Sequence, residues 1–581
     1  MATIGLRICL SFAIGCASLL AAAGVAQAAV DISSKPTKNM SCSAGVCSPT
    51  AKKGILNAND LVNLLQASDV KITTGSGAIT IEVTASFSWV TPSRLTLDAS
   101  YNVSIKAPIA VAGNGALTIT SSDGIGGGQL LFFPGGTIDF WDLSSSLIVN
   151  GKSYVLVNDI EQLAANANGN VALARDYNAS LDGTYLAPPI SGIGDATLEG
   201  LGHAIANFSI RNKTGAAVGL IGSLGSNGIV RDIGIANADI VALDGNTLDY
   251  LYGGALVGQN HGTVLNAYAT GKLKGGNATF LGGLVGYNNG TVANSFADVY
   301  MRGDSFGTVN GYVANGGLVG RNDMDGVVLS SYARGVMAGK DSENVGGLVG
   351  ENQGQISHSW SIGRVLASKG RGTGGLVGLN LGSISDSYSS AEVNGRDASD
   401  VGGGGVGGLV GVNDPGAYGT ADIERSFATG TVRGAQNSCL GGLVGVSDGG
   451  SILNSYSRAA VRLGDTAYGT SGGMVCSNAG SIGYSYSTGV VALGNGGYRG
   501  GLIGGDDSSS DLLDTYWDLN TSGIGDPSRG AGNIANDPGI VGLTDAQLKS
   551  GLPDGFDPAV WGQSATINGG YPYLRANPPP N

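Results

Sequence analysis

One short pattern returns so often along this chain that it decides which kind of fold is available. It reads Gly, Gly or Ala, Leu or Met, Val or Ile, then Gly, and one copy ends in Cys476 instead of the last glycine. Nine copies, 28 to 34 residues apart, begin at Gly254, Gly282, Gly316, Gly346, Gly374, Gly407, Gly441, Gly472 and Gly500. A repeat of this length is typical of solenoids, in which each unit buries its apolar face against the next.

Two more positions recur in step with the glycines. An asparagine follows the first glycine by six residues in seven copies, at Asn260, Asn288, Asn322, Asn352, Asn380, Asn413 and Asn478. An aromatic follows later, at Tyr268, Phe296, Tyr332, Trp360, Tyr388, Phe427, Tyr456, Tyr486 and Tyr516. We expect stacked asparagines to form a hydrogen-bonded ladder and the Asn-Gly pairs to make turns in which asparagine adopts a left-handed conformation.

Each repeat is therefore predicted to form one coil of about three short strands. The glycine pairs allow close approach of neighbouring coils and positive φ at corners. Leu and Val alternate across a strand, so one of the two points inward. Stacking buries a continuous column of Leu, Val, Ile and aromatic side chains. A β-propeller is the alternative, but its blades need about 40–50 residues, more than these repeats contain.

The composition agrees with many short strands joined by tight turns. The chain has 102 glycines, 42% hydrophobic residues and 13% charged residues, so it has enough apolar surface to fold and disorder is a poor interpretation. Its net charge is −13. Because an acidic chain repels phosphate backbones, nucleic acid is not an expected partner.

The N-terminus has the pattern of an export signal. Arg7 precedes an apolar stretch over 8–25, and Ala26-Gln27-Ala28 has the small residues of a cleavage site. We predict a signal peptide over 1–28, cleaved after Ala28. A membrane anchor is less favoured because small residues fill the second half of the apolar stretch and no charged residues follow it directly. The protein is thus expected to be secreted or associated with the outer cell surface.

The mature chain is predicted to have four regions. They are an N-terminal leader and cap over 29–69, an irregular β-helix over 70–215, the repeat β-helix over 216–510 and a C-terminal cap and tail over 511–581. Short helices are expected over 59–66 with Asn59 as N-cap, over 159–166 with Asn158 and Glu161 as a capping box, and from Asp545 with Thr544 as N-cap.

Four cysteines remain after the signal. Cys42 and Cys47 are close enough to form a disulfide, which an exported compartment permits. A metal site there is less favoured because no histidine lies nearby. Cys439 and Cys476 occupy different positions in consecutive repeats. Since stacking alone does not bring such positions together, their pairing is left open.

The repeats resemble those of filamentous-haemagglutinin-like proteins that carry GLUG repeats. The residues concerned run from Gly282-Gly283-Leu284-Val285-Gly286-Tyr287-Asn288 to Ser295-Phe296, with eight counterparts. The stretches 147–151, 201–203 and 569–574 are similar as well. This resemblance implies an all-β, right-handed parallel β-helix, here with short capping helices, that is exported and takes part in adhesion. The motif is specific for architecture, not for a ligand.

Residues suited to catalysis are scarce. None of the three histidines, His203, His261 and His358, stands in a His-Glu-x-x-His zinc motif, and no Gly-x-Ser-x-Gly elbow has a plausible triad. We expect no catalytic residues, no cofactor and no enzyme activity. His261 and His358 lie near repeat turns, where exposed loop positions are the simplest interpretation.

Two weak candidate sites stand out. Calcium could be held by the acidic group of Asp506, Asp507, Asp511 and Asp514, although a solvated cap loop is the simpler interpretation. Arg302-Gly303-Asp304 spells an integrin-recognition triplet in a longer stretch between repeats, where it would be exposed. Such a triplet also arises by chance in a glycine-rich chain.

The variable lengths between repeats indicate where function lies. Repeats lengthen around 303–312, 394–404 and 413–421, and solenoid insertions form loops on one face, which is often the binding face. The favoured hypothesis is an adhesin-type protein that binds a glycan or a host or matrix protein through an extended surface. The alternatives are a β-helix glycosidase or lyase, and a purely structural surface or biofilm component.

Overall fold

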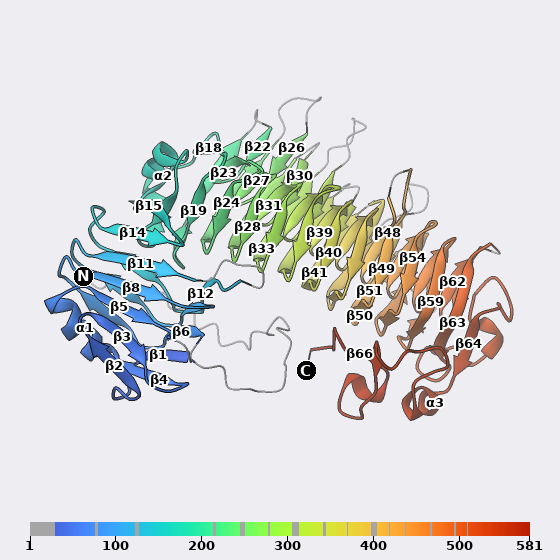
Figure 1. Cartoon of the computed structure of the whole chain (residues 1–581). Helices are drawn as coiled ribbons and strands as arrows, with labels where there is room; N and C mark the ends of the chain where they lie inside the picture. Colours follow the sequence, from blue (N-terminus) through green and yellow to red (C-terminus); the bar gives the residue numbers. More distant parts are fainter. Residues whose placement is uncertain are drawn as a thin grey trace, which may run out of the picture.

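The computed structural model shows a rod of stacked coils with a second stack of strands set at an angle to its N-terminal end (Figure 1). It describes residues 29–580 except 76–78, 122–126, 213–215, 244–249, 277–278, 305–312, 341–343, 369, 397–403, 418, 436, 465–467, 493–495 and 508. The predicted signal peptide and Ala28 lie outside the described residues. Nearly all the strands pair in parallel, so the predicted parallel β-helix is confirmed.

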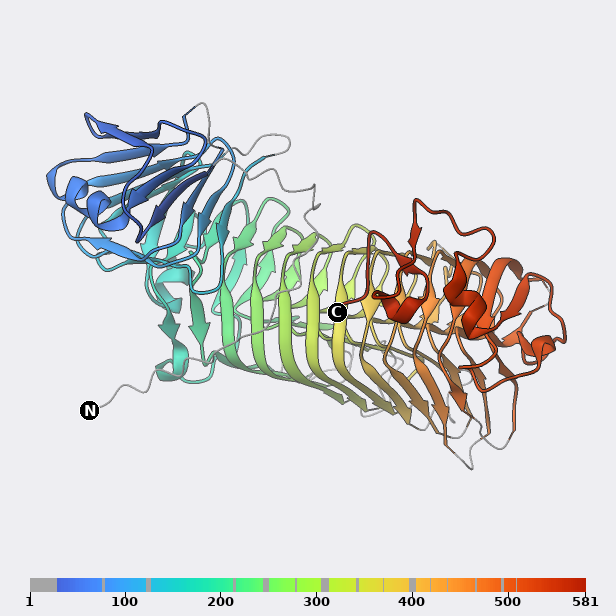
Figure 2. The ribbon, with the colours of Figure 1, turned by 90° about the horizontal axis from the view of Figure 1, so that it is seen from below.

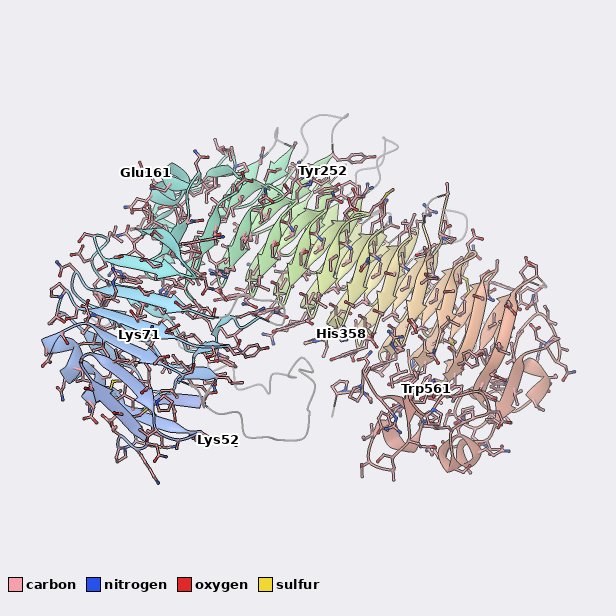
Figure 3. All side chains as sticks on the ribbon, viewed as in Figure 1. Lys52, Lys71, Glu161, Tyr252, His358 and Trp561 are labelled. Atoms are coloured by element: carbon pink, nitrogen blue, oxygen red, sulfur yellow. A yellow bond between two sulfur atoms is a disulfide. The ribbon has the colours of Figure 1, made fainter. Side chains whose placement is uncertain are left out.

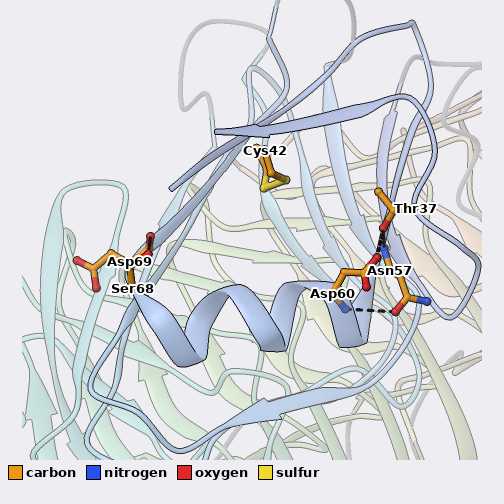
Figure 4. The surroundings of a disulfide bond; sticks show 7 residues. Thr37, Cys42, Asn57, Asp60, Ser68 and Asp69 are labelled. Atoms are coloured by element: carbon orange, nitrogen blue, oxygen red, sulfur yellow. Dashed lines mark hydrogen bonds between the residues drawn. A yellow bond between two sulfur atoms is a disulfide. The ribbon is translucent and has the colours of Figure 1, made fainter. Parts of the chain in front are cut away.

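The N-terminal stack begins at the first described residue. Strand β1 (Ala29–Ser33) lies between β4 (Gly54–Asn57) and β6 (Thr80–Val83) in a five-stranded sheet, so the first part of the region 29–69 already belongs to a coil. Helix α1 (Ala58–Ala67) follows β4. Its N-cap is Asn57, two residues before the predicted Asn59, because the Asn57 side chain accepts hydrogen bonds from the amides of residues 59 and 60 (Figure 4).

The predicted disulfide between Cys42 and Cys47 is present in this stack. It joins β2 (Met40–Ser43) to β3 (Val46–Pro49), an antiparallel hairpin in which the two cysteines are paired directly (Figure 4). The stack has its own apolar core, separate from that of the rod.

A hairpin joins the stack to the rod. Strand β14 (Ser146–Val149) pairs antiparallel with β15 (Lys152–Val157), which pairs in parallel with β16 (Val171–Leu173). Helix α2 (Ile160–Asn166) lies between these strands, and its N-cap is Asp159, not the predicted Asn158. The Asp159 side chain accepts from the Gln162 amide at 2.7 Å, so the cap lies one residue later than predicted.

The coils from β22 (Ala217–Val218) to β41 (Trp360–Ser368) contain four strands each, one more than predicted, and in the next three coils the last strand is divided into two. A representative coil has β30 (Thr279–Gly282), β31 (Val285–Asn288), β32 (Thr291–Ala293) and β33 (Phe296–Asp304). The extra strand arises because the backbone bends at Gly283 and Leu284, between β30 and β31. In register, β31 and its counterparts form an eleven-stranded sheet from β18 (Ile190–Ile193) to β62 (Ile503–Asp506).

The glycine pairs serve close packing alone. A Cβ on Gly282 would lie 1.9 Å from the Val285 carbonyl oxygen, and one on Gly283 would lie 2.1 Å from that of Gly317 in the next coil. Neither glycine has a positive φ, so that part of the prediction is wrong. Left-handed residues occur instead two positions before the recurring aromatic, at Asn266, Asn294, Ser330, His358, Asp386, Arg425, Asn454, Tyr484 and Asp514.

The bend also changes the core. Leu284 and Val285 are both fully buried, whereas strict alternation predicts one of them outside. Leu284 lies in the bend, before β31 begins, so the alternation of strand side chains does not apply to it. The two residues, repeated in every coil, form much of the rod's interior.

The predicted asparagine ladder is confirmed. Each Nδ2 donates to the Oδ1 of the next coil, from Asn260 through Asn288, Asn322, Asn352 and Asn380 to Asn413, over 2.6–2.8 Å. All are fully buried, and none has a positive φ, so the left-handed turn conformation predicted for them is wrong. Ser447 takes the next place, and the ladder resumes where Asn478 donates to Asp506 at 2.8 Å.

Cys439 and Cys476 form a second disulfide. Cys439 lies in β52 (Ser438–Gly441) and Cys476 in β58 (Val475–Asn478) of the following coil. The fifth residue of each repeat packs diagonally against the strand that precedes the glycine pair one coil earlier, as Gly445 does against Gly405 and Val406. Cys439 and Cys476 therefore meet through this diagonal contact and not by direct stacking of equivalent positions.

The C-terminal segment folds back along the rod (Figures 1 and 2). After β63 (Asp511–Asp518) and β64 (Ile540–Leu543), helix α3 (Asp545–Ser550) begins at the predicted N-cap Thr544, which forms a capping box with Gln547. Strands β65 (Trp561–Gly562) and β66 (Tyr573–Leu574) pair antiparallel. None of the described helices is long and apolar enough to cross a membrane.

Candidate binding face

The recurring aromatics form a ladder on the outside of the rod, not inside it as predicted. The first four begin long strands, which are β29 (Tyr268–Gly275), β33, β37 (Tyr332–Lys340) and β41 (Trp360–Ser368). The next residue, for example Ala269 or Ala297, is fully buried, so alternation turns the ring outward. From Tyr268 to Tyr486 the rings stack with centroids 4.2–5.9 Å apart and planes within 9°.

Part of this ladder is covered and part is open. Phe556, Trp561, Tyr571 and Leu574 of the C-terminal segment pack over the rungs from Phe427 to Tyr516, which become a second apolar core. Trp561, labelled in Figure 3, donates through Nε1 to Asn454 at 3.2 Å. The Tyr486 hydroxyl donates to the Pro572 carbonyl at 2.6 Å. The rungs from Tyr268 to Tyr388 remain half-buried. Since neighbouring rings cover their faces, these rungs present edges only.

Beside the ladder, the outward positions of the long strands are unusually basic. These positions follow the aromatic by two, four and six residues. In the first coils, which lack the aromatic, they are the residues paired in register with those positions. Where the C-terminal segment does not cover these positions, as it does at Arg458 and Asp518, eight described basic side chains occupy them: Arg211, Lys272, Lys274, Arg302, Arg334, Arg364, Arg433 and Arg462. Three described acidic side chains do so: Asp239, Asp298 and Glu392. We call this surface the basic face; it contrasts with the chain's net charge of −13.

The acids neutralise only part of the basic face. Arg334 pairs with Asp298 at 2.8 Å, while Arg364 and Arg433 share Glu392 at 3.4 and 3.5 Å. Arg211 approaches Asp239 at 3.8 Å. No ion pair within the described residues involves Lys272, Lys274 or Arg462. The face therefore keeps a net positive charge.

A shallow pocket of about 450 Å³ opens on this face. Its lining comes from four neighbouring coils: Asn394, Arg433, Gly434, Ala435, Arg462, Leu463, Gly464 and Ala492. Arg433 and Arg462 are exposed and occupy paired positions of β51 (Thr431–Gly434) and β56 (Ala460–Leu463). Two guanidinium groups beside a small apolar patch form a site suited to an anion on an organic ligand.

A second cluster lies on the sheet that contains β31. The residue between the last glycine and the asparagine of the repeat points outward there, and in four successive coils it is Gln259, Tyr287, Arg321 and Glu351. Arg321 lies 3.2 Å from Asp323 and 3.7 Å from Glu351, and the Tyr287 hydroxyl donates to Asp323. We call this the repeat-position cluster. A variable residue between two fixed ones was the signal that could have revealed it.

Burial changes the acidity of this cluster. It raises the pKa of the Glu351 carboxyl, and the nearby Arg321 guanidinium offsets only part of that effect. Gln353 donates to Glu351 at 2.9 Å. The Tyr252 ring packs against Tyr287, with centroids 5.0 Å apart, at the upper margin of the rod in Figure 3.

The Arg302-Gly303-Asp304 triplet lies in a strand, not in an exposed loop. It forms the end of β33, pairing with Ala338, Gly339 and Lys340 of the next coil. Arg302 is exposed, whereas Gly303 faces inward against Asn315. The predicted exposure is therefore found for Arg302 but not for Gly303, and Arg302 becomes part of the basic face.

The proposed calcium ligands do not converge. Asp506 is buried and accepts hydrogen bonds from Asn478 and Ser510, whereas Asp507 and Asp511 are exposed and Asp514 lies beside Gly555. Among the residues that the structure describes, no three His, Cys, Asp or Glu side chains gather as metal ligands. Asp506 instead ends the asparagine ladder.

The three histidines lie apart from one another, and little of the predicted binding loops is described. His261 and His358 are exposed near coil corners, whereas His203 is buried where the stack meets the rod, with Nε2 2.9 Å from the Ile138 carbonyl oxygen. Two of the predicted binding loops, 303–312 and 394–404, lie mostly outside the described residues, which exclude 305–312 and 397–403. The described part of 413–421 lies against Leu381.

Comparisons with known proteins agree with the repeat. The model of the GLUG motif matches residues 436–462. The chain is a β-solenoid that carries the GLUG motif. It is 29% identical to halomucin of Haloquadratum walsbyi (strain DSM 16790 / HBSQ001) over 240 residues, which is 35% of this chain and 2% of halomucin. A solved IgA1 protease is similar over 47% of this chain and 20% of its own, with 19% identity and a TM-score of 0.33. The chain thus spans a small part of both proteins.

Proposed function

We propose that this protein is an exported adhesin of the filamentous-haemagglutinin-like kind, which binds a glycan or a host or matrix protein through the basic face. The observation that carries the proposal is the concentration of eight basic side chains on one face of an acidic protein. Charge of one sign on a long, regular surface attracts extended partners of the opposite sign.

Two further features support export and a binding role. Both disulfides require an oxidising compartment to persist, which agrees with a secreted or cell-surface location. The recurring residues of the repeat have structural roles: the glycines allow close packing, the asparagines form the ladder and the aromatics stack on each other. Outward positions of the strands are left free for recognition.

The test is an array of glycans and matrix proteins probed with the mature chain, 29–581, and scored for both binding and product release. We expect retention on a defined class of ligand, lost as salt rises, without release of product. Equal, weak signals on every spot would contradict a binding role and favour a purely structural component.

A carbohydrate-active enzyme is the second candidate function. The observation in its favour is the repeat-position cluster, where Asp323 and Glu351 share Arg321 and burial raises the pKa of Glu351. Product release that is lost in Glu351→Gln, but kept in a variant lacking Arg433 and Arg462, would assign activity to this cluster. Absence of product with every ligand that binds would remove this candidate.

A further inference from the structure

We propose that the ligand of the basic face is an acidic polysaccharide, with an acid group held between Arg433 and Arg462. This inference rests on the proposed function and names its ligand class. It begins from one column of the basic face, in which Arg211, Lys274, Arg302, Arg433 and Arg462 lie in register and no described side chain is acidic.

Like charges stand opposite each other on neighbouring strands at two places. Lys274 pairs in register with Arg302, and Arg433 pairs with Arg462. Parallel strands lie about 4.8 Å apart, and like charges placed directly opposite repel each other. At Arg433 the Glu392 carboxylate, 3.5 Å away, offsets part of this repulsion. A bound anion between Arg433 and Arg462 removes the rest, so the arrangement favours a ligand with negative charge.

The pocket adds shape to this charge. Ala435, Leu463 and Ala492 provide small apolar surfaces next to the two guanidinium groups. A guanidinium donates two parallel hydrogen bonds to a carboxylate or a sulfate, and a sugar ring has apolar C–H groups beside its acid group. One acidic sugar therefore matches both parts of the pocket.

The rest of the face suits a linear polymer. The column that contains the two pocket arginines also contains Arg211, Lys274 and Arg302, while Lys272 and Arg364 lie in the neighbouring column. These charges run along the rod axis over many coils. A polysaccharide lying along the rod would place its successive acid groups near them, whereas a single small anion would use only the pocket.

Nucleic acid fits this face less well. The chain's net charge of −13 opposes every polyanion at long range, so the distinction between nucleic acid and an acidic polysaccharide rests on base stacking. Single-stranded nucleic acid also binds by stacking bases on exposed ring faces, and the ladder rings use their faces against each other, with planes within 9°. Nucleic acid is therefore an outcome of the test and not the proposal.

The experiment measures binding of the mature chain to an immobilised polyuronate, with dextran as the neutral polymer and dextran sulfate and single-stranded DNA as other polyanions. The test variant is Arg433→Gln/Arg462→Gln. The matched control is Lys52→Gln/Lys53→Gln, which removes the same charge from exposed residues of the N-terminal stack (Figure 3). Circular dichroism and melting temperature establish that both variants fold.

We expect polyuronate or dextran sulfate to bind, dextran not to bind, and the arginine variant to bind about tenfold more weakly or worse, as expected for lost charge-assisted hydrogen bonds. The lysine control should bind normally. Equal binding of both variants, or stronger binding to DNA, would overturn this inference. Binding only to neutral glycans or to matrix proteins would also overturn it, yet leave the proposed function standing. No binding to any array ligand would contradict both.

Discussion

The two halves of the aromatic ladder have the same geometry and different surroundings. From Phe427 onward the C-terminal segment covers the rings, and Tyr456 and Tyr486 are fully buried. From Tyr268 to Trp360 the same stacking continues with half-buried outer edges, and Tyr388 packs against the covered core at the boundary. The comparison teaches that the repeat fixes where a side chain points, while a segment outside the repeat decides whether it becomes core.

The largest expected effect separates these halves. Tyr456→Ala should cost about 3–5 kcal/mol of local stability because it opens a cavity in the covered core. Tyr332→Ala should cost clearly less, since its site borders solvent. Hydrogen exchange of the coils around each position measures both. Tyr456→Phe is the control: the Tyr456 hydroxyl is buried without a hydrogen-bond partner, so its removal should cost nothing. Equal losses of stability in Tyr456→Ala and Tyr332→Ala would contradict the distinction between a covered and an open half of the ladder.

The second effect concerns the disulfide between consecutive coils. Replacing both Cys439 and Cys476 with serine should lower stability by about 2–4 kcal/mol, because the bond closes a loop between residues 37 apart in sequence. The loss should appear in the covered half and leave the coils around Tyr332 unchanged. Urea unfolding followed by hydrogen exchange tests this, with Cys42→Ser/Cys47→Ser as a control that affects the N-terminal stack.

A smaller effect is expected where the asparagine ladder is interrupted. The Ser447 hydroxyl is buried without a hydrogen-bond partner, between Asn413 and Asn478 in register. Ser447→Asn should restore the ladder and add about 1 kcal/mol, the usual net gain of a hydrogen bond. Conversely, Asn352→Ser should lower stability in the open half. A destabilised Ser447→Asn protein would show that the site is too small for an amide.

The smallest effect is a dependence on pH at the C-terminal end of the rod. Burial and the neighbouring Asp506 raise the pKa of Asp537 from 3.8 to about 6. The folded state therefore holds this proton more tightly than the unfolded state does. The stabilisation is complete below about pH 3.8 and is lost as pH rises through about 6. Melting curves between pH 4 and 7 should show this trend, and Asp537→Asn should flatten it.

Sequence reasoning succeeded where a residue's role follows from the stacking of identical coils. The parallel β-helix, the buried asparagine ladder and the Thr544 cap are examples. It failed where the role depends on geometry within a coil. The aromatics were predicted to lie inside. The residue that follows each of them is buried instead, so the alternation of the strand turns the ring outward. The bend at Gly283 was missed, and with it the fourth strand.

The candidate site was less predictable still. Arg302 was singled out as part of an integrin-recognition triplet, yet it lies in one column with Lys274 and Arg433 of other coils, and only the register reveals this column. Cys439 and Cys476 join through a diagonal contact that direct stacking hides. The repeat-position cluster was visible as a variable residue between glycine and asparagine, but its partners Asp323 and Tyr252 come from other positions of the coil.

Footprinting of the ligand-bound protein tests the central claim most directly. The mature chain is labelled with hydroxyl radicals with and without saturating polyuronate, and protection is mapped by residue. Our account predicts protection on the long strands, at Leu366 in the column of the two arginines and at Tyr300, which is 51% exposed. Protection confined to Tyr252 and Tyr287, with the long strands unchanged, would contradict it and place binding on the other sheet.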